Sequence, residues 1–130
     1  MSTEDVRVRI FVVDDEYAIA TTLATILQRN GFNAASFTAP MEALKAAREG
    51  APDLLISDVV MPGLSGVDLA IQVKQGFPAL KVLLFSGQAP TVALLKTARE
   101  LGYEFEILEK PIHPIEFLQR VKAATGQGPL

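Results

Sequence analysis

Short runs of apolar residues alternate with longer stretches of helical periodicity along this chain. The apolar runs are VRIFVV (8–13), FNAASF (32–37), DLLIS (53–57), KVLLFS (81–86) and EFEIL (104–108). The first, third and fourth are almost wholly apolar, as strands covered on both faces of a sheet are. The second and fifth are more polar, which favours positions at the two edges of the sheet.

Each apolar run is followed by a segment that is predicted to be helical. The apolar residues of the first segment share one helical face: Ile19, Leu23, Ile26 and Leu27. Glycines are expected to end the first four helices: Gly31, Gly50, Gly76 and Gly102. Thr38 is a possible N-cap of the second helix, and Ser65 and Asp68 have the spacing of a capping box at the start of the third. Pro114 suits the first position of the fifth helix.

The strict alternation of five strands and five helices predicts an α/β domain with a parallel sheet. Right-handed crossovers place helices on both faces of such a sheet. A doubly wound sheet of five strands most often has the flavodoxin-like order 2-1-3-4-5, with its switch point between the first and third strands. We expect residues 1–125 to form this domain and residues 126–130 to be a tail or the start of a linker.

The composition excludes several functional classes. The 130 residues carry a net charge of −3, which argues against nucleic acid or an anionic membrane as a direct partner. The chain has no cysteine, so disulfides, thiolate metal ligands and a cysteine nucleophile are excluded. The acidic N-terminus lacks the apolar region of a signal peptide, and no apolar run approaches the roughly 20 residues that span a membrane. We therefore expect a cytoplasmic protein without membrane insertion.

Acidic residues stand where two of the predicted strands end. Asp14 and Asp15 follow the first strand, and Asp58 follows the third. These strands are neighbours at the switch point, where doubly wound sheets bind ligands beyond the carboxyl ends of their strands. Three carboxylates that converge there repel one another unless protons or a cation compensate. Because the available ligand atoms are all oxygen, we expect Mg²⁺ as the cofactor.

Two further strand ends carry residues that suit a phosphoryl group. Ser86 ends the fourth strand, and Lys110 follows the fifth. The serine hydroxyl can donate a hydrogen bond and the lysine supplies a compact positive charge, both of which match phosphoryl oxygens. A cation, a hydroxyl and an ammonium group around one free carboxylate form a site that can move a phosphoryl group onto that carboxylate.

Four motifs at successive strand ends resemble those of the receiver domains of two-component response regulators. They are VVDDE, DLLISDVVMPGLSG, LLFSG and EKP. The resemblance covers roughly residues 7–124, so the domain of residues 1–125 is identified as a receiver domain. It implies a switch in a two-component or phosphorelay system that signals by conformational change. Such a switch is not an enzyme, although slow self-dephosphorylation is expected.

The same resemblance implies a role for each residue of the site. Asp58 would receive the phosphoryl group from a histidine kinase or a phosphotransfer protein. Ser86 and Lys110 would bind the phosphoryl group, and the Lys110–Pro111 peptide bond would be cis. The implied Mg²⁺ ligands are Asp15, Asp14 (through water), Asp58 and the backbone carbonyl of Val60.

The chain departs from the family pattern beside the site. Ile107 stands three residues before Lys110, where many receivers have an aromatic residue that rotates on activation. We therefore assign the switch to Ser86 and Ile107 without that rotation, with coupling through the loop after Ser86. Val60 and Gln88 occupy positions that modulate phosphoryl lifetime in the family, and an apolar residue at position 60 favours a longer-lived phosphoryl state.

The predicted fourth helix has more apolar residues than one face can bury. Val92, Leu95 and Ala98 form one stripe, and Leu94 and Leu101 lie beside it. Exposed apolar residues that lie together often mark a partner surface. We expect the fourth helix, fifth strand and fifth helix to bind an effector or a second copy of the chain, as they commonly do in the family.

These residues also allow other interpretations. Asp14 and Asp15 could simply cap the first helix, and Asp58 could be a turn residue. His113, the only histidine, is expected at a helix start or on the surface rather than as a ligand. A small phosphohydrolase with an aspartyl-phosphate intermediate would need a second acid two residues after Asp58 and an inserted cap domain. A phosphate-independent interaction module of the same fold is the remaining alternative.

Overall fold

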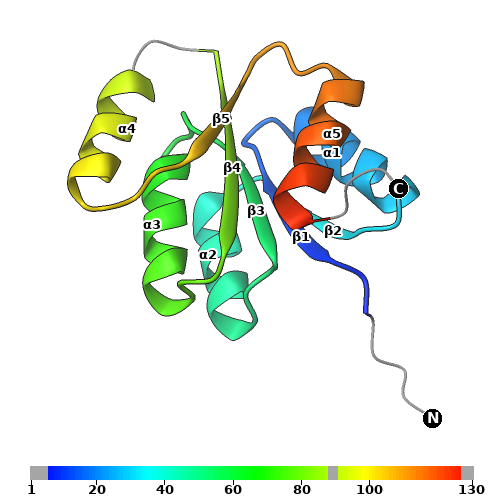
Figure 1. Cartoon of the computed structure of the whole chain (residues 1–130), viewed down its shortest axis with the longest axis horizontal. Helices are drawn as coiled ribbons and strands as arrows, with labels where there is room; N and C mark the ends of the chain where they lie inside the picture. The colour runs from blue at the N-terminus through cyan, green and yellow to red at the C-terminus, as the bar shows by residue number, and fades with distance from the viewer. Residues whose placement is uncertain (1–5, 88–90, 127–130) are drawn as a thin grey trace.

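The computed structural model describes residues 6–87 and 91–126, in which five strands and five helices alternate (Figure 1). The elements are β1 (Arg9–Val13), α1 (Tyr17–Arg29), β2 (Asn33–Phe37), α2 (Pro40–Glu49), β3 (Leu54–Asp58), α3 (Gly66–Gly76), β4 (Lys81–Ser86), α4 (Thr91–Glu100), β5 (Glu106–Glu109) and α5 (Pro114–Thr125). This is the predicted alternation, with most boundaries within two residues of those expected.

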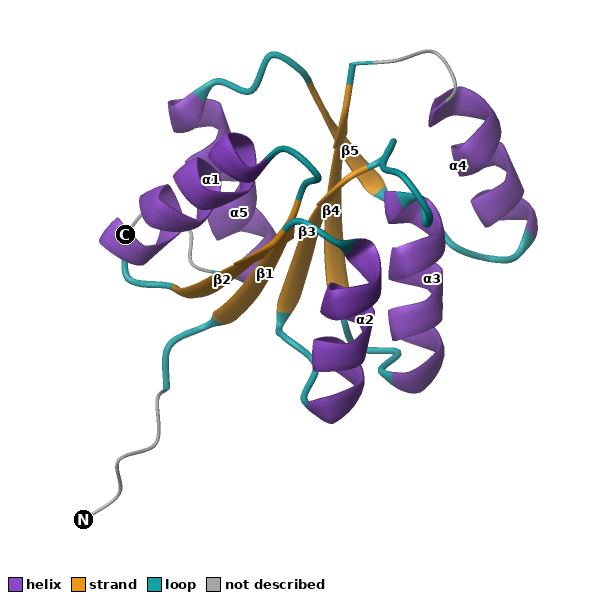
Figure 2. Cartoon of the chain, turned by 180° about the vertical axis from the view of Figure 1, so that it is seen from behind, coloured by secondary structure: helices purple, strands orange, loops and turns teal. Residues whose placement is uncertain are grey.

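The strands form one parallel sheet in the order β2-β1-β3-β4-β5, which confirms the predicted flavodoxin-like topology. The two more polar strands, β2 and β5, lie at the edges. Helices α1 and α5 cover one face of the sheet, and α2, α3 and α4 lie on the other (Figures 1 and 2). The carboxyl ends of β1 and β3 are therefore adjacent at the switch point.

The core has two layers, one on each side of the sheet. Because successive strand residues face opposite sides, Ile10 and Val12 pack toward α1 and α5, whereas Phe11 and Val13 pack toward α2 and α3. The central strands are buried on both faces, since every residue of β3 is buried. This double burial explains why their sequences are continuous apolar runs instead of alternating patterns.

The helix starts follow the sequence signals unevenly. Ser65 caps α3 as predicted, because its Oγ accepts a hydrogen bond from the Asp68 N–H at 3.0 Å. The prediction for Thr38 is wrong: Ala39 is the N-cap residue of α2, and no side chain caps it. Pro40 at the helix start has a fixed φ and no N–H to satisfy, so the helix begins there without a side-chain cap. Pro114 opens α5 as expected, after an exposed His113.

The fifth strand is shorter than predicted and lies further along the chain. It spans Glu106–Glu109 instead of residues 104–108, because only these residues pair with β4. The preceding residues, Tyr103 and Phe105, instead stack their rings with centroids 6.1 Å apart, and both pack on the side of α3 and α4. Alternating aromatic and acidic residues thus produced a strand-like pattern in a segment that is held by side-chain packing.

Helix α4 buries less of its apolar stripe than predicted. Ala98 is fully buried and Leu95 is partly buried, but Val92 is 69% exposed. The helix lies beside α3 at the flank of the sheet, so only part of its surface reaches the core (Figure 1). Within the described part of the chain, no helix combines the length and the apolar character needed to cross a bilayer.

Candidate functional site

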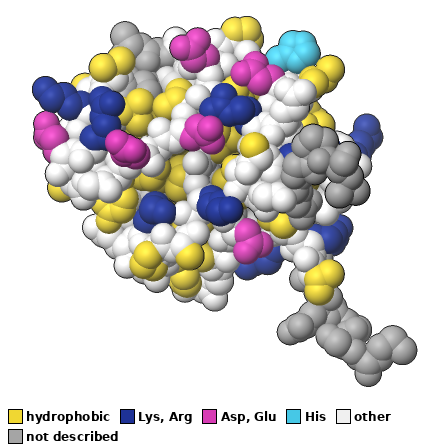
Figure 3. Space-filling view, in the orientation of Figure 1, with side chains coloured by type: hydrophobic (Ala, Val, Ile, Leu, Met, Phe, Trp, Pro, Cys, Tyr) yellow, Lys and Arg dark blue, Asp and Glu magenta, His cyan; other side chains and the backbone are white. Residues whose placement is uncertain are grey.

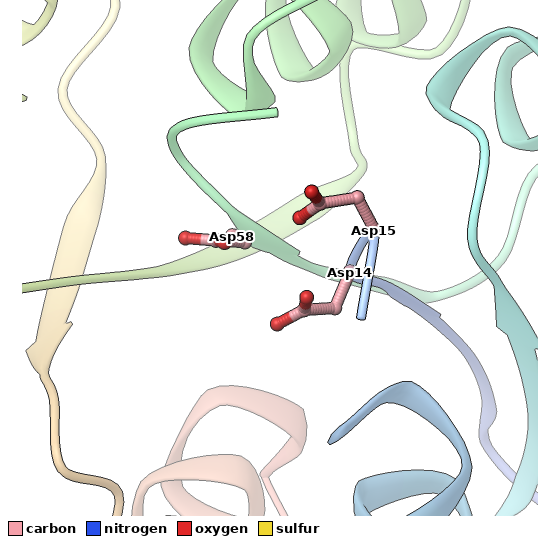
Figure 4. Close-up of side chains that lie close together, drawn as sticks. All are labelled: Asp14, Asp15 and Asp58. Atoms are coloured by element: carbon pink, nitrogen blue, oxygen red, sulfur yellow. The ribbon is translucent and has the colours of Figure 1, made fainter. Parts of the chain in front are cut away.

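Three aspartates meet at the carboxyl ends of β1 and β3. Asp58 is the last residue of β3, and Asp14 and Asp15 directly follow β1. One carboxylate oxygen from each residue lies within 4.8 Å of the other two. Figure 4 shows the three carboxylate groups pointing to the same side of the strand ends. The predicted convergence of these residues at the switch point is thus confirmed.

Asp14 is the most deeply placed of the three, with no exposed surface. Its Oδ1 accepts a hydrogen bond from the Glu16 N–H at 2.8 Å, but its Oδ2 has no hydrogen-bond partner. The pKa of Asp14 is raised from its usual 3.8 to about 6, chiefly because burial disfavours the charged form. The charges of Asp58 and Asp15 add to this rise, whereas the Glu16 N–H and the Lys110 ammonium oppose it.

Lys110 supplies the positive charge of the site. Its Nζ lies 3.1 Å from Asp58 Oδ2 and 3.9 Å from Asp14 Oδ2, so its nearer carboxylate is Asp58. The backbone at Lys110 is tied to β4, since the Lys110 N–H donates to the Ser86 carbonyl at 3.0 Å. The Lys110–Pro111 peptide bond is cis, as predicted. One ammonium group against three carboxylates leaves the cluster acidic.

An open cleft of about 720 Å³ lies over these groups. Its lining comprises Asp15, Glu16, Asp58, Val60, Met61, Pro62, Ser86, Gly87 and Lys110. Five of the residues predicted from the sequence thus line one cleft, and Asp14 completes the acidic cluster beside it. The side chain of Val60 is 39% exposed and places an apolar surface at the cleft.

The donor set fits a hard divalent cation. All three candidate side-chain ligands are carboxylates, and one buried oxygen, Asp14 Oδ2, lacks the partner that such an atom normally has. Mg²⁺ prefers oxygen ligands and commonly binds one or two carboxylates while it retains several waters. A cation would also offset the repulsion from Asp58 and Asp15, which adds to the burial that raises the pKa of Asp14.

Some residues that shape the site were missed in the sequence. Gly66, the first residue of α3, lies so close to β3 that a Cβ there would clash with the backbone oxygen of Asp58 and lie 2.8 Å from Ser57 Oγ. Ser57 Oγ in turn donates to the same Asp58 oxygen at 2.9 Å. Gly66 therefore allows α3 to hold the backbone of Asp58. The only local signal was a glycine directly after the capping Ser65.

Ile107 was also predicted to take part in the switch, but it does not line the cleft. Ile107 is partly buried on the α3 and α4 side of the sheet, against a cluster that includes Leu84 and Ala98. Its side chain could reach the site only through intervening residues. Gln88 lies outside the described residues, and so does the start of the loop that follows Gly87.

The geometry agrees with comparisons to known proteins. Residues 10–122 match the family described as response regulator receiver domain. The DNA-binding response regulator MtrA of Mycobacterium bovis is 32% identical over 120 residues, which are 92% of this chain and 51% of that protein. The transcriptional regulatory protein CreB of Escherichia coli is 35% identical over 116 residues, 89% of this chain and 50% of that protein. A crystal structure of a response regulator receiver domain protein from Clostridium thermocellum matches with a TM-score of 0.81 at 26% identity, covering 92% of this chain and 95% of that one.

The chain belongs to the response regulator receiver domain family, because the family match covers most of its length. It is a flavodoxin-like receiver domain of the two-component type. The chain spans about half the length of the curated relatives it matches. These relatives do not favour the phosphohydrolase alternative, and Asp58 is followed by the apolar Val59 and Val60 instead of a second acid.

Proposed function

We propose that Asp58 is the phosphoryl acceptor of this receiver domain. The observation that carries the proposal is the Asp58 carboxylate, which faces an open cleft and lies 3.1 Å from the Lys110 ammonium beside two further carboxylates. A largely buried carboxylate that lies beside an ammonium group and at an open cleft is well placed for covalent chemistry on its oxygen. An aspartate that only ends a strand would not need this surrounding.

The proposed donor is a phosphohistidine on a histidine kinase or a phosphotransfer protein. A carboxylate oxygen of Asp58 attacks the phosphorus, a P–O bond forms, and the P–N bond breaks. The histidine leaves as imidazole, which takes up a proton, and the aspartate becomes an acyl phosphate. In this step Lys110 moves from the carboxylate to a phosphoryl oxygen and Ser86 donates a hydrogen bond to another.

The proposed metal site uses Asp15, Asp14, Asp58 and the backbone carbonyl of Val60. When bound, Mg²⁺ would neutralise negative charge on the phosphoryl oxygens. The residues of the chain have the complementary tasks: Asp14 supplies buried negative charge, Asp15 offers an exposed ligand, and Asp58 keeps one oxygen for the phosphorus.

Intact-mass spectrometry tests the proposal directly. Incubation with acetyl phosphate and Mg²⁺ should add the mass of one phosphoryl group to the wild type and none to D58N. The matched control is D68N, the same substitution at an exposed acid in the first turn of α3, which should label like the wild type. Chelation of Mg²⁺ should abolish labelling of the wild type and of D68N. Full labelling of D58N, or labelling that survives chelation, refutes the proposed site.

The phosphoryl group is proposed to be lost slowly, so the domain acts as a switch and not as a turnover enzyme. Val60 supports this, because its exposed apolar side chain at the cleft cannot polarise an attacking water. Gln88 is also proposed to modulate the lifetime of the phosphoryl group, and it lies outside the described part of the chain.

The proposed output surface comprises α4, β5 and α5. Three large apolar residues on the two helices or directly after α4 are exposed: Val92 at 69%, Leu101 at 63% and Ile115 at 64%. Figure 3 shows hydrophobic side chains among charged groups of both signs on the face that α4 and α5 flank. Such a surface suits an effector or a second copy of the chain. Ser86 and Ile107 are the proposed switch residues that connect the cleft with this surface.

The receiver domain is taken as residues 1–125, with residues 126–130 as a tail or linker. The net charge of −3 supports partners other than nucleic acid for this domain. The cytoplasmic location stays a prediction.

A further inference from the structure

The side chain of Lys110 has to cross a strand to reach Asp58. Lys110 follows β5 and Asp58 ends β3, with β4 between them in the sheet. Adjacent strands are about 4.8 Å apart, so the backbones of β3 and β5 are roughly 10 Å apart, and the lysine side chain bridges part of this distance across the end of β4. The residues of β4 that lie beneath the side chain of Lys110 therefore help to determine the position of its ammonium group.

Phe85 is the residue of β4 on that path. It pairs in register with Asp58 on one side and with Leu108 on the other, so the three side chains lie on the same face of the sheet. The Lys110 Nζ lies over the Phe85 ring, 5.2 Å from its centroid. The ammonium group is thus close to both the Asp58 carboxylate and the aromatic ring, within the distance at which cations and rings attract each other.

The residue directly after β4 also leaves room for this arrangement. A Cβ at Gly87 would lie only 3.3 Å from Lys110 Cβ and 3.9 Å from its Cδ. The lysine stem therefore passes close to Gly87, and its ammonium end lies over the Phe85 ring. Because the ring is fully buried in the core, it cannot shift away from the stem without disturbing its neighbours.

We propose that Phe85 is a positioning residue for Lys110 and keeps the ammonium group at the acceptor before and after phosphoryl transfer. This inference rests on the proposed role of Asp58. Phosphorylation changes the charge and the position of the oxygens that Lys110 binds, whereas the ring stays neutral and in place. Its attraction for the ammonium therefore persists while the lysine exchanges a carboxylate oxygen for a phosphoryl oxygen.

The test compares two buried phenylalanines of the same core cluster. F85L removes the ring beneath Lys110, and F117L is the matched control, since Phe117 on α5 is equally buried in that cluster. Both variants should lower the urea midpoint to a similar degree. F85L should also lower the rate of labelling by acetyl phosphate, with saturating Mg²⁺, roughly three- to tenfold, whereas F117L should stay within about twofold of the wild type.

Two further measurements separate positioning from packing. The ε-methylene proton resonances of Lys110 should be shifted upfield by the ring in the wild type and in F117L, and should lose that shift in F85L. In a K110M background, F85L should cause no further loss of labelling rate.

If the lysine resonances of F85L keep the wild-type shift, or if F85L labels like F117L, Phe85 is a packing residue only and the inference is wrong. If the wild type takes up no phosphoryl group at all, the proposed function fails instead. The NMR comparison then decides the ring contact alone.

Discussion

Acidic and basic side chains meet at both ends of β1 and β3, and they are used there in opposite ways. At their amino ends, Asp53 Oδ2 accepts the Arg9 N–H at 2.8 Å. The Arg9 guanidinium donates to the Ala51 and Gly50 carbonyls at 3.0 and 3.3 Å. At their carboxyl ends, three aspartates share one lysine, and one buried oxygen of Asp14 has no hydrogen-bond partner. At the amino ends, the hydrogen-bonded Asp53 stabilises the fold. At the carboxyl ends, the acidic cluster has a buried oxygen without a hydrogen-bond partner and can bind a ligand.

The cations at the two ends differ in the same sense. Arg9 lies over the Phe11 ring at 5.8 Å and has a rigid fork of donors that engages two carbonyls at once. Lys110 lies over the Phe85 ring at 5.2 Å and carries a point charge on a flexible stem. Arginine therefore suits a permanent tie between loops. Lysine suits a charge that has to change partners.

The largest expected effect comes from adding one methyl group at each end. G66A forces a Cβ against the Asp58 backbone, where neither α3 nor β3 can retreat easily, and should lower the free energy of unfolding by about 3 kcal/mol. G50A should change it by less than about 0.5 kcal/mol, because Gly50 is extended and its Cβ would lie 3.9 Å from Arg9 Nη1. Urea unfolding measures both, and equal midpoints for the two variants would contradict the close approach of α3 to Asp58.

The next effect concerns pH without metal. The pKa of Asp14 is about 6 in the folded protein and 3.8 ordinarily, so between these values the folded state binds more protons than the unfolded state. Stability is therefore highest below pH 4 for this group and is lost as the pH rises through about 6, by about 3 kcal/mol in all. D14N removes this fall and should be more stable than the wild type at pH 7.5 in a chelator.

The control for that experiment is D53N at the satisfied end. It should lose the bond to the Arg9 N–H yet keep the decrease in stability that Asp14 causes between pH 4 and 6. If the stability of the wild type changes between pH 4 and 6 in the same way as that of D14N, Asp14 is not protonated more readily in the folded state.

The smallest effect is stabilisation by Mg²⁺. A ligand that binds only the folded state stabilises it by about 1.4 kcal/mol at ten times its dissociation constant. We expect this increase in the wild type and in D53N, but not in D15N, which loses the exposed carboxylate of the cluster. Thermal unfolding with and without added Mg²⁺ measures it. If Mg²⁺ stabilises D15N as much as the wild type, the cation does not bind at the acidic cluster.

The sequence by itself determined the order of the elements, and the strand order followed from it. The apolar runs report burial on both faces, and parallel strands joined by helices have few topologies. The same reasoning located the acids and the lysine, because residues that follow strands gather at one edge of a parallel sheet. The position of these residues at one edge of the sheet could therefore be predicted without the tertiary structure: Asp14, Asp15, Asp58, Ser86 and Lys110.

Only the tertiary structure decided which residues lie beside these and how closely. Phe85 lies beneath Lys110 because of the pairing register of β4, and Gly66 approaches Asp58 because of the way α3 packs on β3. The burial of α4 and the start of β5 likewise depend on neighbours far away in the chain. A local pattern records the period and polarity of a segment. The contacts between segments depend on the register and packing that the complete fold imposes.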